Sequence, residues 1–258
     1  MEEVREVKSI ANNFLLMIQF LTRININKNL DCREENFKWG AVFMPVIGFL
    51  IGGIQWIAYK ILINVLPVNV CVVIVLLIGI MLTGAMHIDG LGDMCDGFFA
   101  FKGKDKIIEI MKDSRVGTYS CIAVVLDLIF KYGLLCFIVP RFSMAIISAP
   151  VLSRLSTVFI VTIGKTAKDT GTGNLFIGTV KLPQFLISIV ITAVILLFVL
   201  RINPLYSGIL TLSSIITSYI FNLYCNKKIN GLTGDLLGAN NEIMEIFMFI
   251  IMAAIVNL

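Results

Sequence analysis

Three aspartates, Asp89, Asp93 and Asp96, lie within eight residues of the stretch TGAMHIDGLGDMCDG (83–97). At 100° per residue of an α-helix, their carboxylates fall on one narrow stripe. Three like charges this close would repel one another and raise one another's pKa values. Divalent cations remove that repulsion, and carboxylate oxygens suit Mg²⁺ or Mn²⁺. The spacing predicts a metal site that shares its ions with a substrate phosphate. The alternative is a solvated helix end with incidental acids.

Basic residues follow the aspartates directly. Lys102, Lys104 and Arg115 could neutralise phosphate charge, although the two lysines could equally form a patch for lipid headgroups. Asp113 and Arg115 either take part in the site or close the short helix before them. His87, the single histidine, precedes the aspartates and points away from them on the helical wheel. It either caps the helix or acts as a base, and alone it cannot build a histidine metal site.

Two later polar segments repeat this chemistry. Residues 165–181 are rich in Gly and Thr and contain Asn174, so their open backbone could cradle a phosphate, unless they form an ordinary flexible loop. In residues 230–247, Asp235 and Glu242 stand seven apart on one helical face. They predict a second polar ridge that faces the membrane–water boundary and contacts substrate.

The composition indicates how such residues would be held. Of the 258 residues 58% are hydrophobic and 15% are charged, whereas soluble domains are about half apolar and one quarter charged. Several apolar runs are long enough to cross a hydrocarbon core, and no cleavable signal peptide is expected at the start. Helices are the default because lipid leaves backbone groups no other partner, and the runs do not alternate as barrel strands do. The expected spans are 40–62, 68–86, 117–139, 142–163, 184–201, 204–224 and 243–258.

The expected fold is therefore an all-α polytopic membrane bundle of about six to eight transmembrane helices, in a single domain over 1–258. The shorter apolar piece 10–22 is expected at the interface, and residues 104–113 are expected to form an amphipathic helix on the bilayer surface. The six cysteines stand singly, which favours buried hydrophobes over disulfides or zinc ligands.

The charges predict the orientation of the bundle. Most of the 21 Lys and Arg residues fall in the long loops of one side, which the positive-inside rule places in the cytoplasm. The acids follow the same division, so the active site is expected to face the cytoplasm. A transporter would more often need polar groups at mid-depth. Asp127 and Lys131, four apart within a span, favour that alternative, unless they simply pair with each other.

The chain resembles the cobalamin-5′-phosphate synthase family, also called adenosylcobinamide-GDP ribazoletransferase, over nearly its full length. The matching segments appear in the family's order, and HIDGLGDMCDG and MKDSRVGT are the most specific of them. Asn241 and the N-terminal extension MEEVREVKSI depart from the family pattern. The segments are FLTRI (20–24), MPVIGFLIGG (44–53), TGAMHIDGLGDMCDG (83–97), KDKIIEIMKDSRVGTYS (104–120), GNLFIG (173–178) and GLTGDLLGANNE (231–242).

The resemblance implies a Mg²⁺-dependent enzyme of the cytoplasmic membrane. It would join adenosylcobinamide-GDP to α-ribazole or α-ribazole 5′-phosphate and release GMP. The carboxylates of Asp89, Asp93 and Asp96 would hold one or two Mg²⁺ on the diphosphate, and Lys102, Lys104 and Arg115 would neutralise its charge. The proton of the attacking hydroxyl would pass to Asp113, Asp235 or His87.

Rival interpretations remain at this stage. CDP-alcohol phosphotransferases and prenyltransferases also use acidic motifs with Mg²⁺, and a transporter or cation channel could carry an acidic vestibule. The expected partners are the two substrates and the lipid bilayer, with no nucleic acid, and a homo-oligomer is an open alternative.

Overall fold

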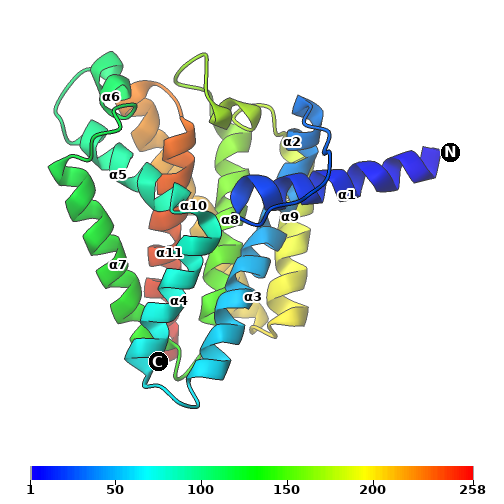
Figure 1. The fold of residues 1–258 in the computed structure, drawn as a ribbon, viewed down its shortest axis with the longest axis vertical. Helices are drawn as coiled ribbons and strands as arrows, with labels where there is room; N and C mark the ends of the chain where they lie inside the picture. The colour runs from blue at the N-terminus through cyan, green and yellow to red at the C-terminus, as the bar shows by residue number, and fades with distance from the viewer. Residues whose placement is uncertain (1, 258) are drawn as a thin grey trace.

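The protein is a bundle of α-helices (Figure 1). A computed structural model describes residues 2–257, with side chains from residue 10 onward, so the domain expected over 1–258 extends one residue beyond the described part at each end. Within residues 2–257 the chain forms helices and no named strand. The elements are α1 (Glu2–Leu21), α2 (Glu34–Gly40), η1 (Ala41–Phe43), α3 (Met44–Leu62), α4 (Val68–Thr83), α5 (Met86–Phe98), α6 (Lys104–Ile110), α7 (Thr118–Ile138), α8 (Ala145–Ile163), η2 (Thr172–Leu175), α9 (Leu182–Val194), η3 (Ile195–Val199), α10 (Pro204–Ile229) and α11 (Gly234–Asn257).

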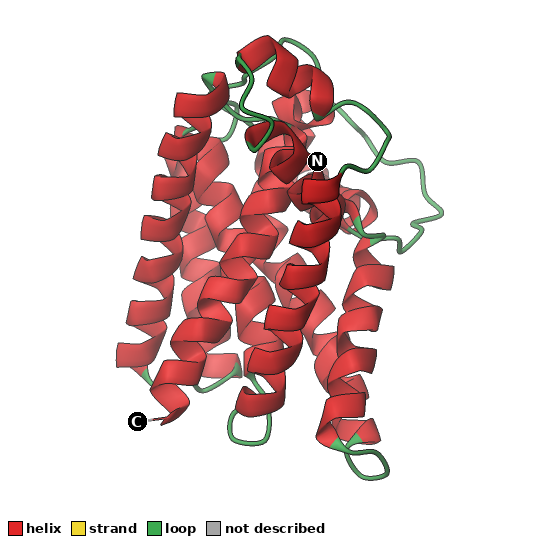
Figure 2. Cartoon of the chain, turned by 90° about the vertical axis from the view of Figure 1, so that its left-hand side faces the viewer, coloured by secondary structure: helices red, strands yellow, loops and turns green. Residues whose placement is uncertain are grey.

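The two ends of the bundle differ (Figure 2). One end carries α2, α6, η2 and the longer loops 22–33 and 164–171, and we call it the loop end. The opposite end carries the short turns 63–67 and 139–144. This is the division that the sequence predicts, since the expected polar segments all emerge at the loop end.

The predicted spans are confirmed in number. Within the described residues, six helices are long and apolar enough to cross a membrane, and the number rises to seven only if the bent pair α4 and α5 is counted as one span. One boundary was wrong: α11 begins at Gly234 rather than at 243, so the polar segment 230–247 supplies its first turns. The chain is therefore a multi-pass membrane protein whose last helix starts with polar residues.

The expected continuous span over 68–86 is broken after Thr83. α4 ends at Thr83, and Gly84 and Ala85 both adopt the left-handed conformation, with φ of 63° and 60°. The chain turns by 87° there, so α5 lies across the end of the bundle instead of continuing through it. Gly84 suits this turn, because a side chain there would also collide with Arg23. The turn moves the aspartates of α5 out of the spanning direction.

Helix α8 is the central element, and most of its residues are buried. It packs on α3, where Gly48 and Gly52 allow the two backbones to meet. A side-chain carbon at Gly48 would lie 2.4 Å from the carbonyl oxygen of Pro150, and one at Gly52 would lie 2.7 Å from that of Ile146. Small residues four apart are typical of such close contacts, because lipid supplies no hydrophobic force between helices.

Helix α6 forms where the amphipathic helix was expected, but it ends at Ile110 rather than at 113. The expectation that its apolar face lies on the bilayer is wrong, since Ile107 and Met111 are buried in the hydrophobic core. A side-chain carbon at Gly97 would lie 2.7 Å from Met111, which shows how closely α5 and this segment pack. The apolar face of α6 therefore covers protein.

The α3–α8 contact generates a prediction with an internal control. Changing Gly52→Ala should overpack the contact and lower Tm in detergent, since overpacking costs about 1–3 kcal/mol, or roughly 2–4 °C per kcal/mol at this size. Changing its neighbour Gly53→Ala places a methyl group where nothing lies within 4 Å, so Tm should hold or rise slightly. Equal Tm values for the two variants would contradict this account of the packing.

Candidate active site

Helix α5 carries the three predicted aspartates at the loop end. Asp89 is exposed, and Asp93 and Asp96 are half-buried. The pKa of Asp93, which lies outside the spanning segments, is raised to about 7. Burial is the largest cause, followed by the negative charges of Asp89, Asp235 and Asp96. The carboxylates thus repel one another, as the spacing predicts.

A fourth carboxylate reaches this group from the first turn of α11. Gly90 and Gly238 make that possible, because they let α5 and α11 approach at backbone distance. A side-chain carbon at Gly90 would lie 2.5 Å from the carbonyl oxygen of Asp235, and one at Gly238 would lie 3.1 Å from the Cα of His87. The sequence predicted Asp235 as a site residue, and the structure brings it to the aspartates of α5.

Asp96 has partners that the other aspartates lack. Its Oδ2 accepts the backbone N–H of Gly117 at 2.7 Å, and its Oδ1 accepts that of Ser120 at 3.0 Å. These groups begin α7, where backbone N–H groups have no intrahelical acceptor and favour negative charge. A side-chain carbon at Gly117 would lie within 2.6 Å of the carboxylate. Asp96 therefore caps α7 from another helix and fixes α5 against it.

A cleft opens at the loop end beside these carboxylates. It encloses about 150 Å³, below the roughly 300–1,000 Å³ of pockets that surround a whole ligand, so it suits one part of a large substrate. Phe20, Met44 and Phe176 form part of its apolar wall. Its charged and polar wall includes His87, Asp89, Arg154, Thr157, Thr172 and Asp235.

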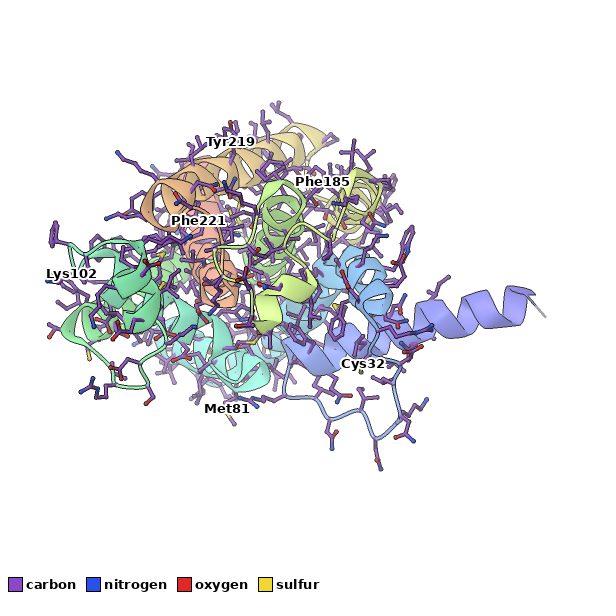
Figure 3. All side chains as sticks on the ribbon, turned by 90° about the horizontal axis from the view of Figure 1, so that it is seen from above. Cys32, Met81, Lys102, Phe185, Tyr219 and Phe221 are labelled. Atoms are coloured by element: carbon purple, nitrogen blue, oxygen red, sulfur yellow. The ribbon has the colours of Figure 1, made fainter. Side chains whose placement is uncertain are left out.

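Eight of the predicted site residues do not line this cleft, and Lys102, Lys104, Asp113 and Arg115 are four of them. Lys102 is exposed at the outer edge of the molecule (Figure 3), and Lys104 begins α6. Asp113 and Arg115 are exposed and bind each other, with Arg115 Nη2 2.6 Å from Asp113 Oδ2. Hydrogen bonds from Arg115 hold the pKa of Asp113 at about 2. Asp113 is thus a weak base in this arrangement.

The Gly/Thr-rich loop does reach the cleft, through Thr172 and Gly173 rather than through Asn174. The side-chain N–H of Asn174 donates to the carbonyl of Lys168 at 3.0 Å, which holds the loop together. A bridge between Thr166 and Leu232 ties the same loop to the start of α11. The segment is therefore a folded wall of the cleft.

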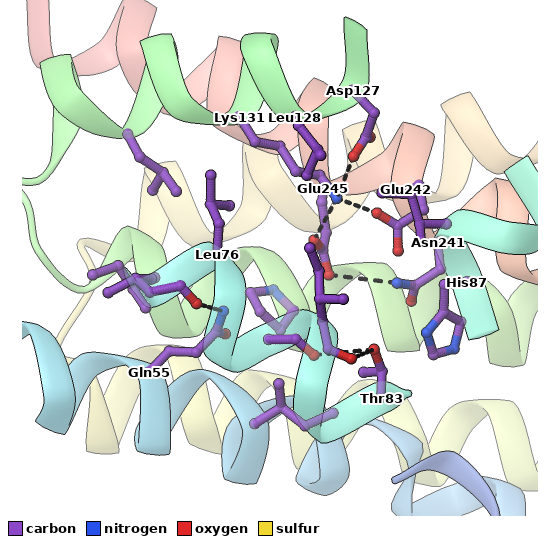
Figure 4. Close-up of a pocket in the computed structure, with 18 of the residues that line it drawn as sticks. Gln55, Leu76, Thr83, His87, Asp127, Leu128, Lys131, Asn241, Glu242 and Glu245 are labelled. Carbon is purple, nitrogen blue, oxygen red and sulfur yellow. Dashed lines mark hydrogen bonds and ion pairs between the residues drawn. The ribbon is translucent and has the colours of Figure 1, made fainter. Parts of the chain in front are cut away.

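A second cavity lies deeper in the bundle and contains an ionic cluster (Figure 4). Lys131 Nζ lies 3.4 Å from Asp127 and 3.1 Å from Glu245, and it also binds Glu242. The pairing of Asp127 with Lys131 was one of two alternatives that the sequence left open, and the contacts of Lys131 with Glu242 and Glu245 were not expected. Glu242 was expected at the membrane–water boundary, and that expectation is wrong: its residue is 8% exposed and lines this inner cavity. A buried ammonium holds the glutamate in place.

His87 and Arg154 line both the cleft and the inner cavity. Arg154 Nη1 lies 2.9 Å from His87 Nε2 and 2.5 Å from Asn241 Oδ1. A guanidinium only donates, so Nε2 of His87 must be the acceptor and its proton sits on Nδ1. The lone pair that a general base would use is thus engaged by Arg154.

Sequence reasoning missed Arg154, Asn241 and Glu245 as parts of one group. A usable signal was present, because Arg154 and Lys131 stand within apolar spans and Glu245 stands in another. Charged residues inside a membrane almost always face a partner in the bundle. The sequence did not show which of them would meet.

The donor chemistry at the loop end fits a hard cation. Within the described residues, no three His, Cys, Asp or Glu side chains are arranged to hold a metal ion by themselves. Mg²⁺ does not need such a group, since it is usually held by one or two carboxylates, waters and substrate phosphates. Asp89 and Asp93 have no basic partner among the described ion pairs, and the pKa of Asp93 is raised first by burial and then by the neighbouring carboxylates.

Comparisons with known proteins identify the family of the chain. Residues 13–253 match the family described as cobalamin-5-phosphate synthase. A curated relative from Clostridium kluyveri, named adenosylcobinamide-GDP ribazoletransferase, is 54% identical over 251 residues, which cover 97% of this chain and all of the relative. Relatives of the same name from Clostridium tetani and Clostridium botulinum (strain Langeland) are 49% and 47% identical, over 94% and 95% of this chain and 96% and 99% of theirs. No solved structure matches significantly. With matches of this extent and identity, the chain belongs to the cobalamin-5-phosphate synthase family.

Proposed function

We propose that this membrane protein joins adenosylcobinamide-GDP to α-ribazole or its 5′-phosphate. The ribose hydroxyl oxygen attacks the corrinoid-side phosphorus of the diphosphate, the bond from that phosphorus to GMP breaks, and the hydroxyl proton passes to the protein. The names of the relatives support the substrates. One structural observation carries the proposal: Asp89, Asp235 and Arg154 meet in a cleft sized for part of a large substrate.

Asp89 and Asp93 are the proposed Mg²⁺ ligands. They share one stripe of α5; Asp89 lines the cleft, and the charges of Asp89 and Asp235 act on Asp93. Bound there, the ion would offset the charge of the diphosphate and of the leaving GMP. Asp96, predicted as a third ligand, holds α5 to the first turn of α7 instead. The two remaining carboxylates are enough, because Mg²⁺ is commonly held by one or two.

Asp235 is the proposed proton acceptor among the three predicted candidates. It lines the cleft opposite α5, and the hydroxyl of Thr233, at 3.3 Å, is its side-chain partner. His87 has its free lone pair on Arg154, and Asp113 has a pKa of about 2 outside the cleft. Asp235 is therefore the candidate that lines the cleft and also has a carboxylate free to accept a proton. The substrate contacts of Lys102, Lys104, Arg115 and Asn174 stay predictions for the parts of the substrate outside the cleft.

The proposed location is the cytoplasmic membrane with the cleft facing the cytoplasm. The basic residues concentrate in the segments of the loop end, which the positive-inside rule assigns to the cytoplasmic side. Both proposed substrates are large polar molecules, so a cleft at this face would let them bind without crossing the bilayer.

Release of GMP tests the proposed function. Purified protein in lipid nanodiscs should release GMP only when adenosylcobinamide-GDP, α-ribazole and Mg²⁺ are all present, measured by chromatography of nucleotides. CDP-diacylglycerol or polyprenyl diphosphate should not replace the corrinoid nucleotide. Release with one substrate alone, or turnover with either lipid substrate, would refute the assignment.

Removal of Asp93 should affect stability in opposite directions with and without metal. At about 100-fold above its Kd, Mg²⁺ adds about 2.7 kcal/mol to wild-type stability, or roughly 5–10 °C in Tm. Asp93→Asn should abolish that rise. Without metal, a carboxyl whose pKa is raised to about 7 favours folding below its unfolded value of 3.8, and this contribution is lost as pH rises through 7. The metal-free variant should therefore melt higher than wild type at pH 8, and the difference should shrink steadily as the pH is lowered toward 4.

The exposed Asp105 supplies the control for this experiment. Asp105→Asn should keep both the Mg²⁺-dependent rise and the wild-type pH profile. A Mg²⁺-dependent rise that survives in Asp93→Asn would show that the ion binds elsewhere.

The proton acceptor has its own test. Asp235→Asn should lower kcat by about 100- to 10,000-fold, the usual contribution of general base catalysis, with little change in KM. A variant with a kcat within threefold of wild type would transfer the role to another group.

A further inference from the structure

We propose that Arg154 binds the phosphate groups of the substrate at the inner side of the cleft, and that Asn241, Glu245 and Lys131 position it. The inference rests on the proposed function and names the protein cation that receives the diphosphate. The sequence had assigned that role to Lys102, Lys104 and Arg115.

Arg154 is an unusual residue for its location. It stands in α8, the most buried helix of the bundle, and is itself 3% exposed. A guanidinium in a membrane interior is costly, so such residues almost always serve a pathway, a ligand or a partner charge. The contacts of Arg154 decide among these.

The contacts of Arg154 are with neutral groups. Its Nη1 donates to the imidazole of His87 and to the amide oxygen of Asn241. Its Nε is buried and has no hydrogen-bond partner. Among the described residues it forms no ion pair with a carboxylate, although five N–H groups are available. A guanidinium that served only structure would be expected to pair with an acid at this depth.

The acids that could have neutralised Arg154 are held by another cation. Glu242 and Glu245 bind Lys131 from α7, and Asp127 lies beside the same ammonium (Figure 4). No carboxylate therefore contacts Arg154 directly, although the charges of Glu245 and Glu242 act on it from a longer distance. A neutral shell around a buried cation is the arrangement that an anion-binding site needs, since a bound anion then supplies the missing partner.

The position of Arg154 matches this role. Among the described residues that line the cleft it is the single Lys or Arg, and Thr157 lies one helical turn further along the same wall. Asp89 and Asp235 line the cleft as well. A diphosphate in the cleft would thus meet a Mg²⁺ ion held by α5 and a fixed guanidinium from α8. Its planar fork of N–H groups suits phosphate oxygens.

The surrounding network holds the guanidinium in one orientation. The amide N–H of Asn241 points to Glu245 Oε1 at 3.4 Å, so its carbonyl oxygen faces Arg154. Ser153 also donates to Glu245 Oε1 at 3.4 Å, and Lys131 binds the other oxygen of that glutamate at 3.1 Å. Asn241 and Glu245 are positioning residues in this account, because they act through Arg154.

Inorganic pyrophosphate tests the site without requiring turnover. With Mg²⁺ present, pyrophosphate should raise the Tm of wild-type protein in detergent, and Arg154→Gln and Arg154→Lys should lose that rise. Both variants should also lose roughly 100- to 1,000-fold in kcat/KM, the range for removing one preorganised donor. Arg141→Gln is the matched control, because it removes the same charge from an exposed arginine at the opposite end, and it should behave as wild type.

An isosteric change tests the neutral shell and keeps the experiment decisive if the Arg154 variants misfold. Asn241→Asp would place a carboxylate on the guanidinium. It should weaken pyrophosphate binding tenfold or more, since about 1.4 kcal/mol of competing attraction is a factor of ten. A purely structural role for Arg154 would instead leave pyrophosphate binding unchanged in this variant.

The two proposals fail separately in these experiments. If wild-type protein releases GMP and the Arg154→Lys and Asn241→Asp variants keep wild-type pyrophosphate binding and kcat/KM within threefold, the phosphate role of Arg154 is overturned and the function stands. If wild-type protein releases no GMP but its pyrophosphate binding depends on Arg154, the anion site stands and the proposed function fails.

Discussion

One ammonium group, that of Lys131, meets three carboxylates in the interior of the bundle, and the arrangement of the cleft depends on this contact. Lys131 and Asp127 belong to α7, whereas Glu242 and Glu245 belong to α11. Charges buried this deeply are tolerated only when they are paired, so the pairing fixes the relative position of the two helices. Since α11 begins at the loop end with Asp235, the same contact sets one wall of the cleft. The buried ion pairs and the cleft are thus linked through helix α11, which contributes residues to both.

Close backbone contacts complete the geometry, because lipid gives helices no hydrophobic reason to associate. Gly48 lets α3 meet α8, and Gly90 and Gly238 let α5 meet α11. The last two contacts bring aspartates from distant parts of the chain to one place, where a bulkier residue would separate them. Asp96 also joins α5 to α7, because its carboxylate accepts hydrogen bonds from the first backbone N–H groups of α7. Packing and capping therefore determine how many carboxylates face the cleft.

Local pattern was enough to predict the all-α membrane bundle of six to eight spans and its polar end, because length, apolarity and charge distribution are properties of single segments. The aspartate stripe of α5 was predictable for the same reason. Arg154 and Asn241 were not, since their meaning depends on which helices pack together. The apolar face of α6 was misassigned because protein and lipid present the same kind of surface to Ile107, and a sequence does not distinguish them. Pairwise contacts between spans are what the sequence left open.

The left-handed pair Gly84 and Ala85 gives α4 a role that its composition does not suggest. Most of α4 is not buried within the bundle, so many apolar replacements along it should be tolerated. The length of α4 is constrained, because α5 follows directly from its end through an 87° bend. One inserted residue would lift α5 by about 1.5 Å and swing its direction by about 100°. Related sequences should therefore differ widely in which apolar residues form α4 but rarely in how many residues it contains, because the length of α4 sets the depth of the aspartates.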